Sequence, residues 1–303
     1  MRIGAIGIDS SHLPEFTKRI KAMNSEGKTK CLVTGFWDPG RHEWQHPAGA
    51  DQSRTDVEGW RKTALDLGAK QVDSLDELLE SVEGVMVLNI NGHRHLELGI
   101  GPIARGMPTY IDKPLTCSID QARSLLAMTR QYKARCYSAS SLRFITEIPK
   151  IPREALGKIV AIDAFGNGEL LDMMPGLWHY GCHTIEMIDA IWGPGVGRVS
   201  AIEYPDRHLV DLEYRDGRYA RLRLERRGSW AFGATLHGEK GVHQFTVDFA
   251  PVYTRLVEGM TRFFEGGAAP VELRDIVESV AVMQAGNDSI RRAGEWVAID
   301  EVR

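Results

Sequence analysis

The fold that this sequence predicts is decided by its first twelve residues, MRIGAIGIDSSH (residues 1–12). Residues 3–6 form a short apolar run of the kind found in buried β-strands, and this run ends at Gly7. A polar turn over residues 9–11 follows, and a helical pattern then occupies residues 15–23. A strand that passes through a glycine turn into a helix is the repeating unit of alternating α/β proteins.

Strand-like and helical segments continue to alternate beyond this unit. Helices are expected to begin after Ser74 and Ser118, because Glu77 and Gln121 follow them at the spacing of a capping box. The other apolar runs are strand-like and lie at residues 31–37, 85–88, 108–111 and 134–139. This order predicts a parallel sheet with right-handed crossovers, and therefore a dinucleotide-binding Rossmann domain over residues 1–142.

The character of the sequence changes after Arg143. Longer runs with alternating polar and apolar residues occupy residues 158–165, 199–204, 209–214 and 219–225. An Asp-Gly pair between the last two runs favours a tight hairpin, and helical patterns lie at residues 180–191 and 274–292. We therefore predict an α+β domain over residues 143–303 with a large, mostly antiparallel open sheet.

The bulk composition argues against several classes of protein. The 303 residues carry a formal net charge of −4, so there is no basic excess to bind nucleic acid. The four cysteines form no CxxC pair, which is typical of reduced thiols in a reducing compartment. No run approaches the roughly 18–20 apolar residues that span a bilayer. We expect a cytoplasmic protein without a membrane or nucleic-acid partner.

The first turn departs from the glycine pattern GxGxxG that a Rossmann domain normally carries there. Gly7 occupies the first glycine position, but Asp9 stands at the second and His12 at the third. A carboxylate at Asp9 would repel a pyrophosphate unless it points away. Ser10 and Ser11 could bind the anion at the helix N-terminus, or residues 9–11 could simply cap the helix. Both interpretations stay open.

Further candidate cofactor contacts follow the predicted strands. Asp38 comes directly after the second strand, where an acid would bind a ribose 2′-hydroxyl and favour NAD. Arg41 leaves NADP possible, and the alternative for Asp38 is an ordinary Asp-Pro-Gly turn. Asn91 and His95 lie just after another strand, where ligands bind in open α/β sheets.

The segment YIDKPL (residues 110–115) resembles the glucose–fructose oxidoreductase and inositol dehydrogenase family (Gfo/Idh/MocA). Most members carry Glu-Lys-Pro after a strand, where this chain has Asp112, Lys113 and Pro114. Their lysine lies beside the nicotinamide and the reacting hydroxyl. The resemblance implies a catalytic Lys113 that contacts cofactor and substrate, with Asp112 also at the cofactor.

The resemblance extends through SSLRF (140–144), HGEKG (237–241) and the helical pattern near the end of the chain. The second signature of the family is Asp-x-Gly-x-His, and HYGCH (179–183) stands in its place. His183 therefore matches the histidine that accepts the proton, while His179 replaces the aspartate. The resemblance also implies a homodimer or homotetramer that forms through the C-terminal sheet.

Oxidation of a secondary alcohol needs a hydride acceptor and a base. Histidine suits the base because its pKa lies near neutrality, and a lysine can stabilise the developing alkoxide. Lys113 and His183 would supply these parts from the two domains. Further candidate substrate contacts are Arg143, Asp172, Trp178 and His179. His179, His183 and Glu186 are four and three residues apart and are predicted to share one helix face. His179 or Glu186 would assist the base, with Glu186 orienting His183, or the three residues could hold a metal.

These features predict an NAD(P)-dependent oxidoreductase that acts on a secondary hydroxyl of a sugar, polyol or sugar acid. NAD is the expected cofactor, NADP stays possible and no metal is expected. One alternative is a non-catalytic or regulatory relative that binds a sugar or nucleotide, because the glycine motif is degenerate and the aspartate is absent. The other is a metal-dependent enzyme that uses the face of His179 and His183.

Overall fold

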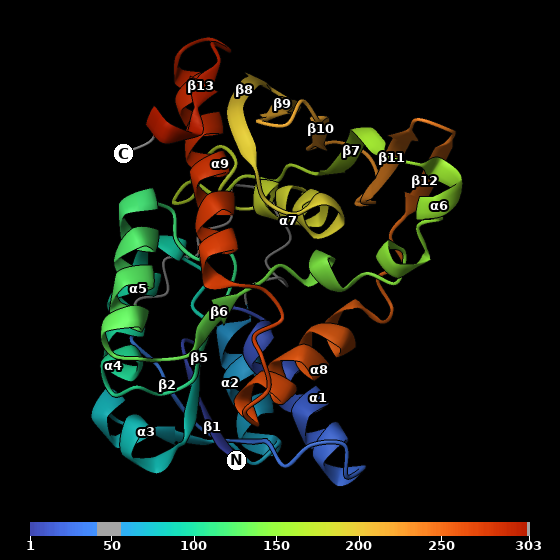
Figure 1. The fold of residues 1–303 in the computed structure, drawn as a ribbon. Coiled ribbons are helices and arrows are strands. Elements are labelled where there is room, and N and C mark those ends of the chain that lie inside the picture. Colours follow the sequence, from blue (N-terminus) through green and yellow to red (C-terminus); the bar gives the residue numbers. More distant parts are fainter. Residues whose placement is uncertain (41–55, 302–303) are drawn as a thin grey trace. The chain divides into compact units, whose positions relative to one another are not determined.

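The computed structural model describes residues 1–40 and 56–301. Arg41 and most of the polar stretch 38–61 lie outside the described residues, so a role of Arg41 toward NADP stays a prediction. The chain forms two compact units (Figure 1). The first consists of Met1–Thr116, Gln121–Ala139 and Tyr253–Arg274, and the second of Cys117–Asp120, Ser140–Val252 and Asp275–Arg303.

A six-stranded parallel sheet forms the centre of the first unit, with the strand order β3-β2-β1-β4-β5-β6. Its strands are β1 (Arg2–Ile6), β2 (Leu32–Trp37), β3 (Lys70–Val72), β4 (Gly84–Val87), β5 (Thr109–Ile111) and β6 (Cys136–Ser138). All residues of β4 and β5 are buried, as their apolar runs predict. The predicted Rossmann sheet is confirmed. The short edge strand β3 was not predicted, because its sequence KQV has no apolar run.

Helices cover both faces of this sheet (Figure 1). They are α1 (His12–Ser25), α2 (Val57–Asp66), α3 (Leu75–Ser81), α4 (His95–Ala104) and α5 (Ile119–Gln131). The strand order reverses after β3, so right-handed crossovers place α1 and α2 on one face and α3, α4 and α5 on the other. The predicted cap of α3 is confirmed, because the Glu77 backbone N–H donates to the Ser74 hydroxyl at 3.2 Å.

Helix α8 (Val252–Phe264) also belongs to the first unit, although it follows nearly all the strands of the second. The thiol of Cys31 lies 3.8 Å from the carbonyl oxygen of Thr261, and the Arg135 guanidinium donates to the carbonyl of Phe263 at 2.7 Å. The prediction placed every residue after 142 in the second domain. These contacts instead place Tyr253–Arg274 in the first unit.

The second unit is built on a seven-stranded sheet with the order β12-β11-β7-β10-β9-β8-β13. Its strands are β7 (Ile159–Asn167), β8 (Val196–Tyr204), β9 (Arg207–Tyr214), β10 (Tyr219–Glu225), β11 (Gly233–Gly238), β12 (Val242–Thr246) and β13 (Val297–Ala298). Apart from the parallel pair β7 and β10, neighbouring strands are antiparallel, which confirms the predicted sheet. The predicted hairpin joins β9 to β10 through Gly217, whose φ of +86° suits glycine.

Two main helices pack in this unit, and both were predicted. They are α7 (Gly181–Trp192), which contacts β7 and β10, and α9 (Leu273–Arg291); a single-turn helix, α6 (Arg153–Leu156), precedes β7. Asn287 of α9 accepts a hydrogen bond from the backbone N–H of Leu177 at 2.9 Å, which ties α9 to the segment before α7. Within the described residues we find no helix with the length and apolar character needed to cross a membrane.

Candidate active site

The turn after β1 requires a glycine at its first position. Gly7 has a φ of +94°, and a Cβ atom there would lie 2.7 Å from the backbone nitrogen of Asn89. Any side chain would therefore be strained and would collide with the residues that follow β4. Among described non-glycine residues, positive φ angles occur at Lys133 and Ala293. Asp9 thus has a backbone conformation open to any residue, so the second glycine position can change without strain.

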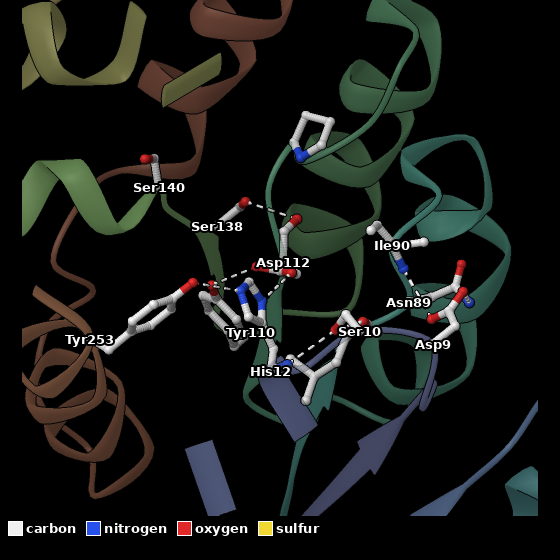
Figure 2. Close-up of polar contacts among 12 residues, drawn as sticks. Asp9, Ser10, His12, Asn89, Ile90, Tyr110, Asp112, Ser138, Ser140 and Tyr253 are labelled. Atoms are coloured by element: carbon white, nitrogen blue, oxygen red, sulfur yellow. Dashed lines mark hydrogen bonds and ion pairs between the residues drawn. The ribbon is translucent and has the colours of Figure 1, made fainter. Parts of the chain in front are cut away.

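The Asp9 carboxylate points into the protein, toward the end of β4 (Figure 2). It accepts hydrogen bonds from the side-chain amide of Asn89 at 2.9 Å and from the backbone N–H of Ile90 at 3.1 Å, and the residue is 1% exposed. The alternative in which Asp9 caps α1 is therefore excluded, and Ser11, the N-cap residue, makes no side-chain capping bond. The negative charge of Asp9 is stabilised by the two donors, Asn89 and Ile90, that follow β4.

Ser10 contributes differently from the predicted anion contact. Its hydroxyl donates to the carbonyl of Leu88 at 3.0 Å and lies 3.4 Å from the backbone nitrogen of His12. The residue is 7% exposed, whereas Ser11 is exposed. The Ser10 side chain therefore links the turn to β4, and any contact with a phosphate through this stretch would come from backbone groups or from Ser11.

His12, at the third glycine position, forms a buried ion pair with Asp112 (Figure 2). Its Nδ1 lies 2.6 Å from Asp112 Oδ2, and its Nε2 lies 3.2 Å from the hydroxyl of Tyr253 in α8. Tyr110 donates to the other carboxylate oxygen at 3.2 Å, and the imidazole stacks on Phe16. The position that normally allows close packing by glycine is filled here by a hydrogen-bonded ring.

This network keeps Asp112 ionised. Burial by itself would raise the pKa of Asp112, but the charge and hydrogen bond of His12 and the nearby charge of Lys113 hold that pKa well below its usual range. Burial, with a smaller effect of the Asp112 charge, raises the pKa of Tyr253 to about 12, so this hydroxyl stays protonated. Lys113 is half-buried and follows the anchored carboxylate directly, at the carboxyl end of β5.

In the second unit, His183 lies in the first turn of α7, and its Nδ1 is 2.7 Å from the hydroxyl of Ser140. Glu186, one turn later, accepts from the backbone N–H of Ser140 at 2.7 Å and from Arg143 Nε at 2.7 Å. Arg143 also pairs with Asp189, and its side chain is 9% exposed. The helix therefore carries a histidine that is hydrogen-bonded to a serine, and one turn later a buried ion-pair network.

Comparisons with known proteins identify a family model that matches the N-terminal part of the chain. Residues 1–140 match the model of the oxidoreductase family with an NAD-binding Rossmann fold, GFO_IDH_MocA. Residues 1–140 belong to this oxidoreductase family. The resemblance inferred from Asp112, Lys113 and Pro114 is confirmed at this level, and so are the predictions of an NAD(P)-dependent enzyme and of NAD as its cofactor. No curated protein sequence matches the chain significantly.

Solved structures share the whole fold. GenD2 from gentamicin A biosynthesis, in complex with NAD, is 16% identical with a TM-score of 0.79, covering 98% of this chain and 96% of that one. An oxidoreductase from Thermotoga maritima is 17% identical with a TM-score of 0.77, covering 100% and 99%. UDP-N-acetylglucosamine 3-dehydrogenase GnnA from Acidithiobacillus ferrooxidans is 14% identical with a TM-score of 0.75, covering 96% and 99%. At these identities the likeness shows the fold alone.

Two other predicted cofactor residues, Asp38 and Asn91, follow strands of the parallel sheet. Asp38 follows β2 and accepts from the backbone N–H of Gly40 at 2.9 Å, so the Asp-Pro-Gly turn is present, and it also pairs with Arg61 at 3.0 Å. Asn91 caps a 3₁₀ turn, η2 (Gly92–Arg94), by accepting from the His93 backbone N–H. Both side chains sit at strand ends, where a role toward the nucleotide stays a prediction.

His95 has a structural role in place of the predicted cofactor contact. The ring is fully buried, with Nε2 2.6 Å from the carbonyl of Asn89 and Nδ1 2.9 Å from that of Pro114. Burial lowers the pKa of His95. The ring therefore links the residues that follow β4 to those that follow β5, next to Lys113. Because it is fully buried, it has no exposed surface for a ligand.

Several of the predicted substrate-binding side chains are buried or paired with other side chains of the protein. Arg143 is bound by two acidic residues of α7, as described above, and Trp178 is 6% exposed, so neither side chain has the open surface that a substrate contact needs. Asp172 is exposed in a turn. His179 is 3% exposed and precedes α7, so the prediction of a shared helix face with His183 is wrong.

The metal alternative is not supported. Glu186 is engaged by Ser140 and Arg143, so the expectation that it orients His183 is replaced by a bond between Ser140 and that ring. Within residues 1–40 and 56–301, no three His, Cys, Asp or Glu side chains are grouped as a metal site.

Two site residues escaped the sequence analysis. Tyr253 reaches His12 from a helix 241 positions away, and no local pattern points to that contact. Ser140 was noted as part of SSLRF, but its bond with His183 was not predicted. One usable signal existed for Ser140, since serine preceding a short turn is a common N-cap, and the Leu142 backbone N–H does donate to it at 3.1 Å.

Proposed function

We propose that the chain is a dehydrogenase that transfers a hydride between NAD(P) and a secondary hydroxyl of a sugar, polyol or sugar acid. The observation that carries the proposal is the anchored strand end at Asp112 and Lys113. A buried, ionised Asp112 fixed by His12 precedes a half-buried lysine at the carboxyl edge of a parallel sheet, the edge where open α/β sheets bind ligands.

The residues of the first turn fit a dinucleotide. Asp9 directs its charge toward Asn89 and Ile90, so the substitution at the second glycine position does not direct a carboxylate at an approaching pyrophosphate. Gly7 keeps the tight turn, and Ser11 at the start of α1 supplies an exposed hydroxyl. Asp38 would bind the adenine ribose. When bound, the nicotinamide supplies or accepts the hydride.

In the proposed reaction, Lys113 orients the substrate hydroxyl and stabilises the developing alkoxide through its ammonium group. His183 exchanges the hydroxyl proton through Nε2, because its Nδ1 is bound by Ser140. His12, Asp112 and His95 fix the backbone segments next to Lys113 through their hydrogen bonds. They do not contact the reacting atoms themselves.

A carbohydrate-like substrate is favoured by the aromatic side chains around His183. The ring of Tyr180 lies 5.3 Å from that of His183 and 5.6 Å from that of Trp230, which is 45% exposed. A sugar ring has an apolar face of C–H groups that packs on the electron-rich face of an aromatic ring. Trp230 is thus a better stacking candidate than the buried Trp178, and GnnA is named as a sugar-nucleotide dehydrogenase.

The first test is calorimetric titration with NADH and then NADPH, repeated on Asp38→Ala. We expect micromolar binding that weakens about tenfold or more in the variant, the cost of one lost charge-assisted hydrogen bond. A screen of sugars, polyols and sugar acids would follow, with Lys113→Ala and His183→Ala as inactive controls. Binding without turnover of any candidate would favour the non-catalytic relative. No binding of either nucleotide would reject the proposal.

We also propose that two or four copies of the chain associate through the seven-stranded sheet. Apolar side chains on strands of this sheet are partly exposed, including Val160 at 41%, Ile202 at 42% and Val242 at 63%. Size-exclusion chromatography with light scattering should give a mass of two or four chains, and Ile202→Glu should lower it. A monomer at micromolar concentration would contradict the proposal.

A further inference from the structure

Two residues of α7 hold Ser140 at two points. His183 contacts its hydroxyl at 2.7 Å, and Glu186 accepts its backbone N–H at 2.7 Å. His183 and Glu186 are three residues apart, so they lie on one face of the helix. Ser140 is fully buried and is the residue at which the chain enters the second unit after β6. The entry point is therefore attached directly to the helix that carries His183.

The attachment is supported by charge. The Glu186 carboxylate, which is 1% exposed, is paired with Arg143, and the same guanidinium binds Asp189 one turn further along α7. Arg143 lies in the 3₁₀ helix η3 (Ser141–Phe144), whose N-cap is Ser140. Hydrogen bonds to charged groups are stronger than neutral ones, and buried pairs are screened little by solvent. Two direct bonds therefore hold Ser140 against α7, and the two ion pairs of Arg143 join the adjoining 3₁₀ helix to the same helix.

The hydroxyl of Ser140 has a limited capacity for hydrogen bonds. It has one donor and two acceptor sites, and the Leu142 backbone N–H occupies one acceptor at 3.1 Å. The second acceptor and the donor can each face His183 Nδ1. When Nδ1 carries a proton, the hydroxyl oxygen accepts a hydrogen bond from Nδ1–H; when only Nε2 carries a proton, the hydroxyl rotates and donates to Nδ1. The hydrogen bond can therefore form with both the neutral and the protonated imidazole. A general base passes through both of these states.

We propose that Ser140 is the positioning residue of His183: it binds Nδ1 and so turns Nε2 toward the substrate in both protonation states. The inference deepens the proposed function, because it rests on His183 as the group that exchanges the substrate proton. A serine adds no negative charge beside the ring. It therefore fixes the orientation of the imidazole without the extra stabilisation of the imidazolium that a carboxylate partner would give.

The test compares Ser140→Ala and Ser140→Thr, which keeps the hydroxyl, with Ser141→Ala as the matched control from the next residue. The ¹⁵N and ¹H signals of the His183 ring, assigned with His183→Gln, report its tautomers and titration without any need for activity. We expect Ser140→Ala to alter the Nδ1 shift and the titration midpoint, while Ser140→Thr and Ser141→Ala retain the wild-type values. Far-ultraviolet circular dichroism and melting temperature check that each variant is folded.

Kinetics form the second readout. With a substrate found in the screen, Ser140→Ala should lower kcat about tenfold to a hundredfold and displace the acidic limb of the pH profile, with the dissociation constant of NADH unchanged. Ser140→Thr should restore most of kcat. Unchanged ring signals in a folded Ser140→Ala protein would overturn the inference. Altered signals in a protein without dehydrogenase activity would reject the proposed function and leave the role of Ser140 toward His183 intact.

Discussion

Replacement of His12 by alanine tests the central electrostatic argument. The ion pair with Asp112 spans 2.6 Å, and the two side chains are only 10% and 3% exposed. Removing one partner of a buried pair strands the other charge, which typically costs about 3–5 kcal/mol. Tyr110 still donates to Asp112, and Lys113 stays nearby, so we expect the lower end, about 3 kcal/mol, or a fall in melting temperature of roughly 6–12 °C for a unit of this size.

The chain offers a matched control in a second His–Asp pair. His237 lies 2.8 Å from Asp163, but these side chains are 40% and 63% exposed, and exposed pairs contribute only about 0–1 kcal/mol. Urea denaturation and thermal melts of His12→Ala, His237→Ala, Asp112→Ala and the double variant of residues 12 and 112 give the coupling energy. The double variant should be less destabilised than the sum of its parts. Equal effects of His12→Ala and His237→Ala, or additive effects within the cycle, would refute the reasoning.

The pH dependence of His12→Ala has a definite sign. In the wild type the pKa of Asp112 is lowered, so its stabilising contribution is present above the unfolded pKa of about 4 and is lost only as the pH falls through the folded value. In the variant, burial acts on Asp112 without the imidazole and raises that pKa. The stability difference between the two proteins should therefore be largest at neutral pH and narrow as the pH falls toward 4. A difference independent of pH would contradict this account.

Three other substitutions give separate checks. Gly7→Ala should destabilise the first unit by about 2–4 kcal/mol in urea denaturation, because φ is +94° and the new Cβ would lie 2.7 Å from the Asn89 nitrogen; an effect below 1 kcal/mol would mean that the turn relaxes. Asp9→Gly should leave NADH affinity within about threefold in calorimetry, since the carboxylate already points inward, whereas a tenfold gain would show that its charge opposes the pyrophosphate. Trp230→Ala should raise KM for a sugar substrate about fivefold to twentyfold with kcat little changed, and an unaltered KM would exclude stacking there.

Much of this fold could be predicted from local sequence patterns. The continuous apolar runs of β4 and β5 indicate strands buried on both faces, and alternation in β9 and β10 indicates a half-exposed antiparallel pair. Gly7 marks the tight first turn, and the short motif at Asp112 and Lys113 points to the family. These signals are readable because strand and helix periods and turn geometry depend on neighbours a few residues apart.

The tertiary structure alone decided which polar groups became partners. In the sequence, Asp9 and His12 indicate a phosphate-binding turn that has lost two of its glycines. In the structure, Asp9 binds the residues after β4, and His12 binds Asp112, which lies 100 positions away. Tyr253 of α8 contacts His12, and Ser140 contacts His183, which lies 43 positions away in the sequence. Such bonds form because burial removes the water that would otherwise bind a charge or a hydrogen-bond donor. Each buried polar group therefore needs a protein partner, which can come from any element packed beside it. The spacing of residues in the sequence does not reveal which distant elements pack side by side.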